Sequence, residues 1–292
     1  MIQVLPAALA AFILSACNVP GITAPTPTVT QTPTPSYTPT VTPVPLILSV
    51  NGEGLTAAEF NAAVARYKKA EEALGKTIDP AEAITTVGQD LTDTLLLGQG
   101  AAAEGKTIDD AAVQSRIEAL AAQVGGEAAL TDWEDAHGYT EADFRADLKR
   151  QMAAALMRDQ IMKSVPKTAE QVHVRQILLY SAEAAGQALA DLKAGTSFDD
   201  LAARYAPITS GELGWFPRGY LTETAIETAA FALQVGQYSE VIETETGFHI
   251  LYLVEREPNH PLSPDALLAL QKRVVADWLT QQRNQSTILF NP

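Results

Sequence analysis

Cysteine is almost absent from this chain, which has a single one, Cys17, among 292 residues. One thiol cannot form an internal disulfide, so no cross-link holds the fold together. Basic residues are also few: 20 Lys and Arg stand against 35 Asp and Glu, giving a formal net charge of −15. This balance argues against nucleic acid and an anionic membrane surface as partners. The length favours about two domains, and the 47% of hydrophobic residues are ample for a core.

The apolar run at the N-terminus is too short to cross a bilayer comfortably, because spanning takes ~20 apolar residues. Residues 1–16 end in Leu14-Ser15-Ala16, directly before Cys17. This resembles a bacterial lipobox, which implies a cleaved signal peptide and a lipidated Cys17 whose two acyl chains anchor the protein. A plain cleaved signal with an incidental cysteine is the alternative. The run has none of the positive charge with which signal peptides usually begin, which leaves the translation start open.

A low-complexity segment follows the cysteine. Residues 20–45 hold eight Pro and nine Thr among 26 residues, with no charged side chain. Proline fixes φ and removes backbone donors, so this composition favours extended polyproline II over packed structure. At ~3.1 Å per residue the segment reaches on the order of 80 Å, and it is predicted to be a disordered stalk.

Apolar residues at helical spacing dominate the chain from Leu46 to Pro166. The run Leu46–Val50 predicts a strand or an extended anchor that ends in the turn Asn51-Gly52. Helices are then expected to begin near Thr56 (with Glu59 as a capping box), Asp79, Thr107 or Asp109, and Thr140. A short helix that holds Leu130 and Trp133 is expected before the last of these. A further helix is predicted over residues 263–286 and completes this helical domain if it packs back on it; the alternative is that it packs on the domain before it.

This helical part carries no catalytic constellation. His137, beside Trp133, is expected to be a surface or capping residue. Met152, Met157 and Met162 are either core residues or the lining of an adaptable apolar groove for other polypeptides.

Six blocks of sequence between residues 172 and 250 occur in a characteristic order. They are Val172–Leu178, Ser197–Ala202, Gly211–Gly219 (the glycine-rich aromatic stretch Gly-Glu-Leu-Gly-Trp-Phe-Pro-Arg-Gly), Ala229–Leu233, Val235–Ser239 and Thr244–Ile250. On spacing alone, Gly211–Gly219 predicts an aromatic turn that closes a core or borders a cleft. In this order and at this spacing, the blocks resemble a parvulin-type peptidyl-prolyl isomerase domain over about ninety residues. The rest of the chain looks like the lipoprotein foldases and periplasmic chaperones of the PrsA and SurA types.

The resemblance implies an α+β fold, in which a mostly helical SurA-N-like chaperone domain is joined to a small FKBP-like β-α-β isomerase domain. It implies an extracytoplasmic, membrane-anchored foldase whose partners are unfolded or Pro-containing secreted polypeptides, with no cofactor. The boundaries that follow are 1–17 for the signal peptide and lipobox, 18–45 for the stalk, 46–166 with 263–286 for the chaperone domain, 167–258 for the isomerase domain, and 259–292 for a linker and the C-terminal helix.

The resemblance also assigns site residues. The catalytic polar group falls on His249, with Thr244 and Thr246 as its Thr/Ser pair, and on Gln176, where the family has a second histidine. The apolar substrate-binding set falls on five residues: Leu213, Phe216, Leu221, Ile226 and Phe231. Because the helix that holds Ile226 has one extra residue, that assignment can shift to Ala225.

Two features depart from the family pattern. Gln176 stands in for a histidine, and His173 is a poor substitute because it points to the other face of its strand. The loop 206–210 is short and carries no acidic residue.

Three functions therefore stay open: an isomerase, a holdase chaperone that binds unfolded chains without isomerising them, and a surface adhesin or scaffold. The four histidines have no metal-ligand spacing, Asp199-Asp200 marks a helix N-terminus, and no Ser/His/Asp motif is present.

Overall fold

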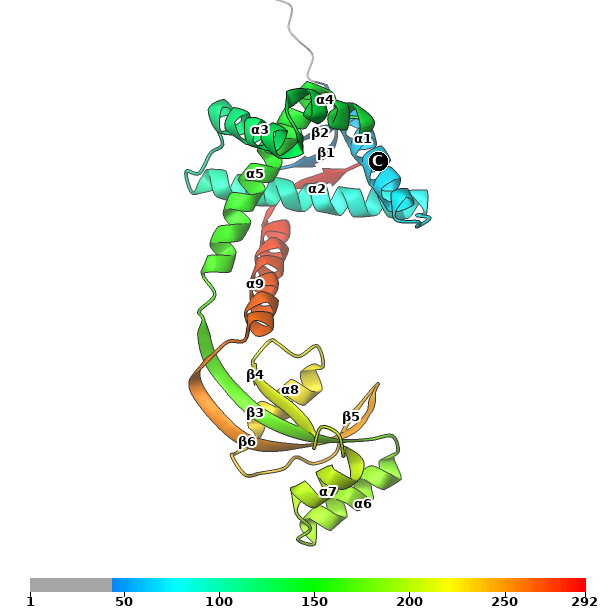
Figure 1. Cartoon of the computed structure of the whole chain (residues 1–292), viewed down its shortest axis with the longest axis vertical. Helices are drawn as coiled ribbons and strands as arrows, with labels where there is room; N and C mark the ends of the chain where they lie inside the picture. Colours follow the sequence, from blue (N-terminus) through cyan, green and yellow to red (C-terminus); the bar gives the residue numbers. More distant parts are fainter. Residues whose placement is uncertain (1–43) are drawn as a thin grey trace, which may run out of the picture. The chain divides into compact units, whose positions relative to one another are not determined.

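The computed structural model of this chain describes residues 44–292. The predicted signal peptide, Cys17 and the Pro/Thr-rich segment up to residue 43 lie outside the described residues. The described part holds a helical domain and a smaller α/β domain inserted between its last two helices (Figure 1). None of the helices in residues 44–292 combines the length and the apolarity needed to cross a membrane.

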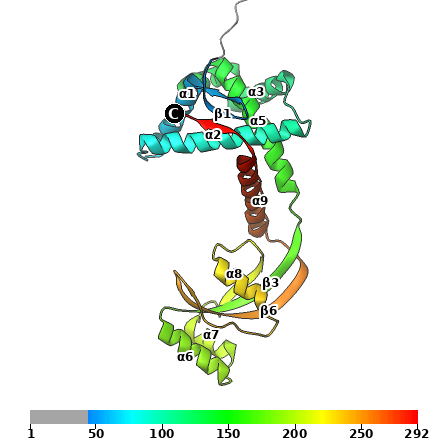
Figure 2. The same cartoon turned by 180° about the vertical axis from the view of Figure 1, so that it is seen from behind.

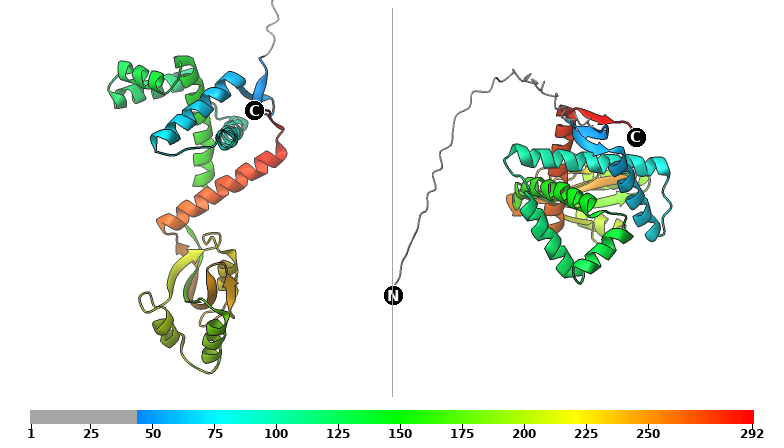
Figure 3. Two further views of the ribbon diagram at one scale, coloured as in Figure 1. Left: turned by 90° about the vertical axis from the view of Figure 1, so that its right-hand side faces the viewer. Right: turned by 90° about the horizontal axis from the view of Figure 1, so that it is seen from above.

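The helical domain begins with a β-hairpin. The predicted strand β1 (Leu46–Val50) is confirmed, and it pairs with β2 (Glu53–Thr56) across the turn at Asn51-Gly52. Both turn residues have positive φ, 55° and 87°, as the favoured two-residue hairpin turns require. The sequence did not predict β2, nor the third strand β7 (Ile288–Phe290), which pairs with β1 on its other side (Figure 3).

Five helices follow the hairpin, in the regions where the sequence predicted helices. They are α1 (Ala57–Ala73), α2 (Pro80–Ala103), α3 (Asp110–Val124), α4 (Glu127–Ala136) and α5 (Glu141–Lys163). The capping box at the start of α1 is confirmed, because the Glu59 carboxylate accepts from the backbone N–H of Thr56 at 2.9 Å. Of the two alternatives for α3, Asp109 is the N-cap, and its side chain accepts from the N–H of Ala112.

The helix α9 (Pro264–Gln285) packs in the core of this helical domain. Its Leu279 is buried in one cluster with Leu91 and Leu95 of α2 and Met157 of α5. Met157 is therefore a core residue and does not line a groove. The Phe290 ring of β7 joins the same cluster and lies so close to α2 that a Cβ at Gly88 would sit 2.7 Å from it.

The α/β domain is built on a four-stranded antiparallel sheet in the order β4-β3-β6-β5. Its strands are β3 (Thr168–Leu179), β4 (Glu212–Pro217), β5 (Ile242–Thr244) and β6 (Gly247–Pro261), and its helices are α6 (Ala182–Lys193), α7 (Phe198–Tyr205) and α8 (Thr224–Ala232). The sequence predicted β3 and β6 but treated Gly211–Gly219 as a turn. Most of that stretch is instead strand β4, which adds to the edge of β3 and buries Phe216 beneath α8.

Each face of this sheet carries its own hydrophobic core. Ile177 and Leu179 of β3 pack with α6 and α7 on one face, whereas Val172 and Val174 pack with α8 on the other. Figure 2 shows the helices on the two sides of the sheet. Because side chains alternate along β3, only every second residue can reach a site on the α8 side. Gln176 lies on the same face as Val172 and Val174.

Candidate active site

A polar cluster around His249 lies at the junction of β3, β5 and β6. His249 is only 5% exposed. Its Nε2 lies 2.8 Å from the Thr244 hydroxyl and 3.3 Å from the Thr246 hydroxyl, and its Nδ1 lies 3.0 Å from Oε1 of Gln176. The two hydroxyls are 3.0 Å apart. The structure thus brings together all four polar residues that the sequence analysis named.

The hydrogen bonds fix the tautomer of His249. An amide oxygen only accepts, so Nδ1 carries the proton and donates to Gln176, which leaves Nε2 to accept from Thr244. Burial lowers the pKa of His249 below its ordinary value of about 6.5, and the negative charge of Glu223 opposes this only in part. The ring is therefore neutral at pH 7. The cluster presents hydroxyl groups whose orientation a neutral imidazole sets.

The five predicted substrate-binding residues gather in one hydrophobic cluster beside the polar one, but they are not equally accessible. Three are buried, with exposures of 1% for Phe216, 4% for Ile226 and 5% for Phe231. Leu213 and Leu221 pack against these three and keep part of their surface exposed. Of the five, only these two leucines keep surface that a ligand can contact, and the three buried residues pack beneath them. Ala225 is exposed and Ile226 faces the core, so the structure places Ile226 in the cluster.

A carboxylate that the sequence did not predict shapes this apolar site. Glu227 of α8 accepts from the backbone N–H groups of Gly219 at 2.8 Å, Tyr220 at 3.1 Å and Leu221 at 3.3 Å. These bonds hold the turn between β4 and α8 and thereby place the Leu221 side chain. The donors are main-chain groups, so no residue type in the sequence marks this interaction.

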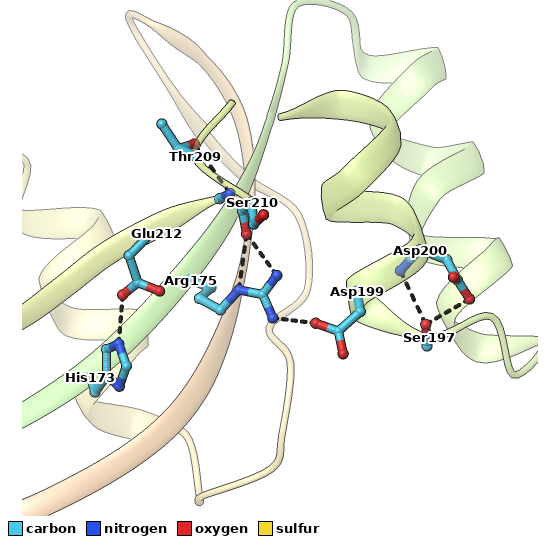
Figure 4. A network of polar contacts seen from close by, with 9 residues as sticks. His173, Arg175, Ser197, Asp199, Asp200, Thr209, Ser210 and Glu212 are labelled. Atoms are coloured by element: carbon cyan, nitrogen blue, oxygen red, sulfur yellow. Dashed lines mark hydrogen bonds and ion pairs between the residues drawn. The ribbon is translucent and has the colours of Figure 1, made fainter. Parts of the chain in front are cut away.

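A second missed interaction holds the short loop 206–211 against β3 (Figure 4). The Arg175 guanidinium donates from Nε and from a terminal nitrogen to the carbonyl of Ser210, at 2.9 and 2.7 Å, and it also pairs with Asp199. The carbonyl of Gly211 accepts from the Gln176 N–H at 2.6 Å. Asp200 behaves as predicted, since its N–H donates to the capping hydroxyl of Ser197, whereas Asp199 has this additional partner.

His173 belongs to a different group of side chains. Its Nε2 lies 2.5 Å from the Glu212 carboxylate (Figure 4), and its ring stacks on Trp215 with centroids 5.3 Å apart. His260 stacks on Trp215 at 4.1 Å. His173 is therefore engaged away from His249, in line with its predicted orientation.

Comparison with known proteins gives two family matches. Residues 180–255 match the PPIC-type PPIase domain, and residues 21–158 match the SurA-like N-terminal domain. The chain is 28% identical over 166 residues to the foldase protein PrsA of a Geobacillus species, covering 53% of this chain and 59% of that one. It is 29% identical over 148 residues to the chaperone SurA of Methylobacillus flagellatus, covering 44% and 34% respectively.

Among solved structures, the parvulin NmPin of Nitrosopumilus maritimus is 31% identical to this chain. The match covers 31% of this chain and all of that one, with a TM-score of 0.27. The chain thus spans between a third and three-fifths of the length of the two curated relatives, and the whole of the small parvulin.

Proposed function

We propose that this chain, which belongs to the foldases that join a SurA-like N-terminal domain to a PPIC-type parvulin domain, catalyses the cis–trans isomerisation of Xaa-Pro peptide bonds in unfolded polypeptides. The observation that carries the proposal is the juxtaposition of two groups. A buried neutral His249 orients the hydroxyls of Thr244 and Thr246. The partly buried side chains of Leu213 and Leu221 lie in the neighbouring cluster.

Isomerisation is limited by rotation about a partial double bond. The barrier of a peptide bond is ~18–20 kcal/mol, and X-Pro bonds interconvert in tens to hundreds of seconds. In the twisted state the amide loses its conjugation, so its carbonyl and nitrogen no longer share charge as they do in the planar state. An enzyme accelerates the step only by interactions that are stronger in the twisted state.

The two groups divide this task. Leu213 and Leu221 hold the proline ring by burying its apolar surface, which fixes one side of the bond. The other side, with its carbonyl, rotates over the polar cluster, where preoriented hydroxyls bind the twisted amide better than the planar one. Each 1.36 kcal/mol of such preference is worth a factor of ten in rate. Neither covalent chemistry nor a cofactor is needed for this reaction.

A holdase function is the second candidate, and Gln176 favours it. In the family pattern a second imidazole occupies this position, and here an amide replaces it. The Gln176 amide nevertheless bonds the Nδ1 of His249 at 3.0 Å, so the orientation of the histidine is preserved. We therefore rank isomerisation first and binding without isomerisation second.

The test is the isomerisation rate of an Xaa-Pro peptide in the presence of residues 44–292, measured by exchange NMR. His249→Ala and Gln176→Ala are measured beside it, with Val235→Ser, an exposed residue of the same domain, as control. Activity that falls at least tenfold in His249→Ala and persists in the control supports the proposal. If the wild type has no activity above background, while it suppresses aggregation of an unfolded client and Gln176→His gains activity, the chain is a holdase.

We further infer that the protein works outside the cytoplasm, held to a membrane by lipidated Cys17 and serving secreted polypeptides. The lipobox-like sequence before Cys17 and the Pro/Thr-rich segment after it support this. Expression with a radiolabelled fatty acid tests it. The full chain is expected to be labelled and to sediment with membranes, whereas Cys17→Ser is expected to be unlabelled and released.

A further inference from the structure

A pocket of about 370 Å³ lies between α3, α4 and α5 of the helical domain and shares no residue with the proposed isomerase site. The three helices pack around a small hydrophobic cluster of their own, formed by Ala121, Leu130 and Phe144 (Figure 1). The volume of the pocket lies within the range of cavities that hold small ligands in proteins.

Acidic side chains dominate the lining of this pocket. On α4, Glu127, Leu130 and Glu134 are three and four residues apart, so they lie on one face of the helix, and all three line the pocket. The basic side chain in the lining donates to the Gln114 side-chain oxygen at 2.6 Å. The charged residues of the lining are five acids and one base: Glu118, Glu127, Glu134, Asp135, Glu141 and Arg145.

Glu134 differs from the other four acids because it is buried. It is only 7% exposed, whereas the other four acids are exposed at the rim. No hydrogen bond or ion pair within residues 44–292 engages its carboxylate. Burial raises the pKa of Glu134, and the like charges of Glu141 and Asp135 raise it further. Since burying a charge without a partner costs free energy, this carboxylate points to a cation from outside the described residues.

The carboxylates are not arranged as metal ligands. Residues 44–292 hold no group of three or more His, Cys, Asp or Glu side chains that is placed to bind a metal ion. An ammonium or guanidinium group carries several N–H donors and binds a single carboxylate well, so an organic cation suits one buried glutamate better.

The pocket also offers apolar surface beside Glu134. Leu130 and Ala121 are 6% and 4% exposed, and Ile117 is partly buried against them. Lysine and arginine side chains bury their methylene stems on apolar surface while their charged ends reach a polar partner. The combination of an apolar wall, a buried carboxylate and an acidic rim therefore matches these two side chains.

We propose that the pocket between α3, α4 and α5 binds the lysine or arginine side chain of a partner polypeptide, and that the Glu134 carboxylate accepts hydrogen bonds from its charged end. This assignment goes beyond the proposed isomerase function and does not depend on it. It gives the helical domain a recognition element for basic segments.

The test is an NMR titration of residues 44–292, which form a compact unit, at neutral pH. The probes are heptapeptides with blocked ends, Ala-Ala-Gly-Xaa-Gly-Ala-Ala, in which Xaa is Lys, Arg, norleucine or Glu. They contain no proline, so isomerisation plays no part in the result. The Lys and Arg peptides are expected to shift the amide signals of Leu130, Thr131 and Glu134. They should bind on the order of tenfold more tightly than the norleucine peptide, which keeps the stem and lacks the charge.

Two substitutions on α4 separate the pocket from the general attraction of a cation to a chain of net charge −15. Glu134→Gln and Asp132→Asn each remove one negative charge, but Asp132 is exposed and outside the lining. Glu134→Gln is expected to weaken Lys-peptide binding on the order of tenfold, and Asp132→Asn by less than about twofold. The melting temperature of Glu134→Gln should be equal to or above that of the wild type, because the variant removes an unpaired buried charge.

Four results would overturn the proposal. They are absence of binding by the Lys and Arg peptides, equally tight binding of the norleucine peptide, equal weakening by the two substitutions, and calcium chloride alone shifting the same amides at lower concentration than the Lys peptide. The second would indicate an apolar groove and the fourth a metal site. If Glu134→Gln does not fold, the comparison of the Lys and norleucine peptides on the wild type decides.

Discussion

Two glycines in the loop and strand beside Gln176 allow steric overlap to be separated from backbone conformation. Gly211 and Gly214 both have φ of 77°. A Cβ added at Gly214 meets no atom within 4 Å, whereas a Cβ at Gly211 overlaps the carbonyl oxygen of Gln176 and lies 3.2 Å from its carbonyl carbon. Substitution by alanine therefore imposes the same conformational cost at both positions and a steric cost at only one.

The expected magnitudes differ accordingly. An L-residue in the left-handed region costs roughly 1–2 kcal/mol. The lower backbone entropy of alanine in the unfolded chain offsets roughly 0.4–1 kcal/mol of that cost. We expect Gly214→Ala to lower the free energy of unfolding of the α/β domain by about 1 kcal/mol. Gly211→Ala must also push the loop away from β3 and break the 2.6 Å bond between Gln176 and Gly211. Leaving that amide unpaired costs about 1–3 kcal/mol more, for a total of about 3 kcal/mol.

Amide hydrogen exchange of residues 44–292, followed by mass spectrometry on β3 and β6, measures these free energies. The isomerase assay is run in parallel, because displacement of Gln176 should loosen His249 and reduce activity more than tenfold in Gly211→Ala, with little change in Gly214→Ala. Equal destabilisation by the two substitutions, or a Gly211→Ala variant with full activity, would refute the steric argument.

Three further predictions concern other parts of the chain. Glu227→Ala removes the acceptor of three backbone donors and should lower the unfolding free energy of the α/β domain by about 3 kcal/mol in urea denaturation, whereas Glu227→Gln should lower it less. Because the pKa of His249 is lowered on folding, the unfolded chain takes up the proton first as pH falls below about 6.5, so stability should be constant above that pH and decrease below it. Isomerase activity should decrease only at the lower pH at which His249 of the folded protein is protonated, and the same pH profile of stability in His249→Ala would contradict this assignment. Phe290→Ala should destabilise the helical domain by about 3 kcal/mol in thermal unfolding, whereas Leu289→Ala, 58% exposed, should change it by less than about 0.5 kcal/mol.

Local patterns in the sequence were sufficient to predict where the helices of residues 44–292 lie. The pair Thr56 and Glu59, the N-cap Asp109 and the turn Asn51-Gly52 each act within a few residues, so their effect can be predicted without the fold. The strands β2, β5 and β7 were missed because each has only three or four residues, too few for a period to be recognised.

The candidate site likewise has a part that local sequence patterns predict and a part that they do not. Thr244, Thr246 and His249 lie on one hairpin, and their spacing in sequence largely determines their proximity in space. The contact of Gln176 with His249 spans 73 residues and was named only through the family resemblance. The roles of Glu227 and Arg175 involve backbone acceptors and donors in loops, which no sequence pattern reveals. The sequence assigned both Phe216 and Leu213 to the substrate-binding set, but only the structure shows that Phe216 is buried and that Leu213 is partly exposed.

The pairing of β1 with β7 has a consequence for how the chain matures. Asn51 and Thr287, 236 residues apart, are joined by hydrogen bonds of 2.8 and 2.9 Å. The helical domain is therefore incomplete until β7 has been synthesised and pairs with β1. Contacts of such high sequence separation slow folding, because loop-closure entropy is lost before they form. The inserted domain brings Thr168 beside Pro261 through its own sheet and so shortens the loop that remains to be closed. We therefore expect the inserted α/β domain to fold before the helical domain is complete and to hold the two segments of that domain close together.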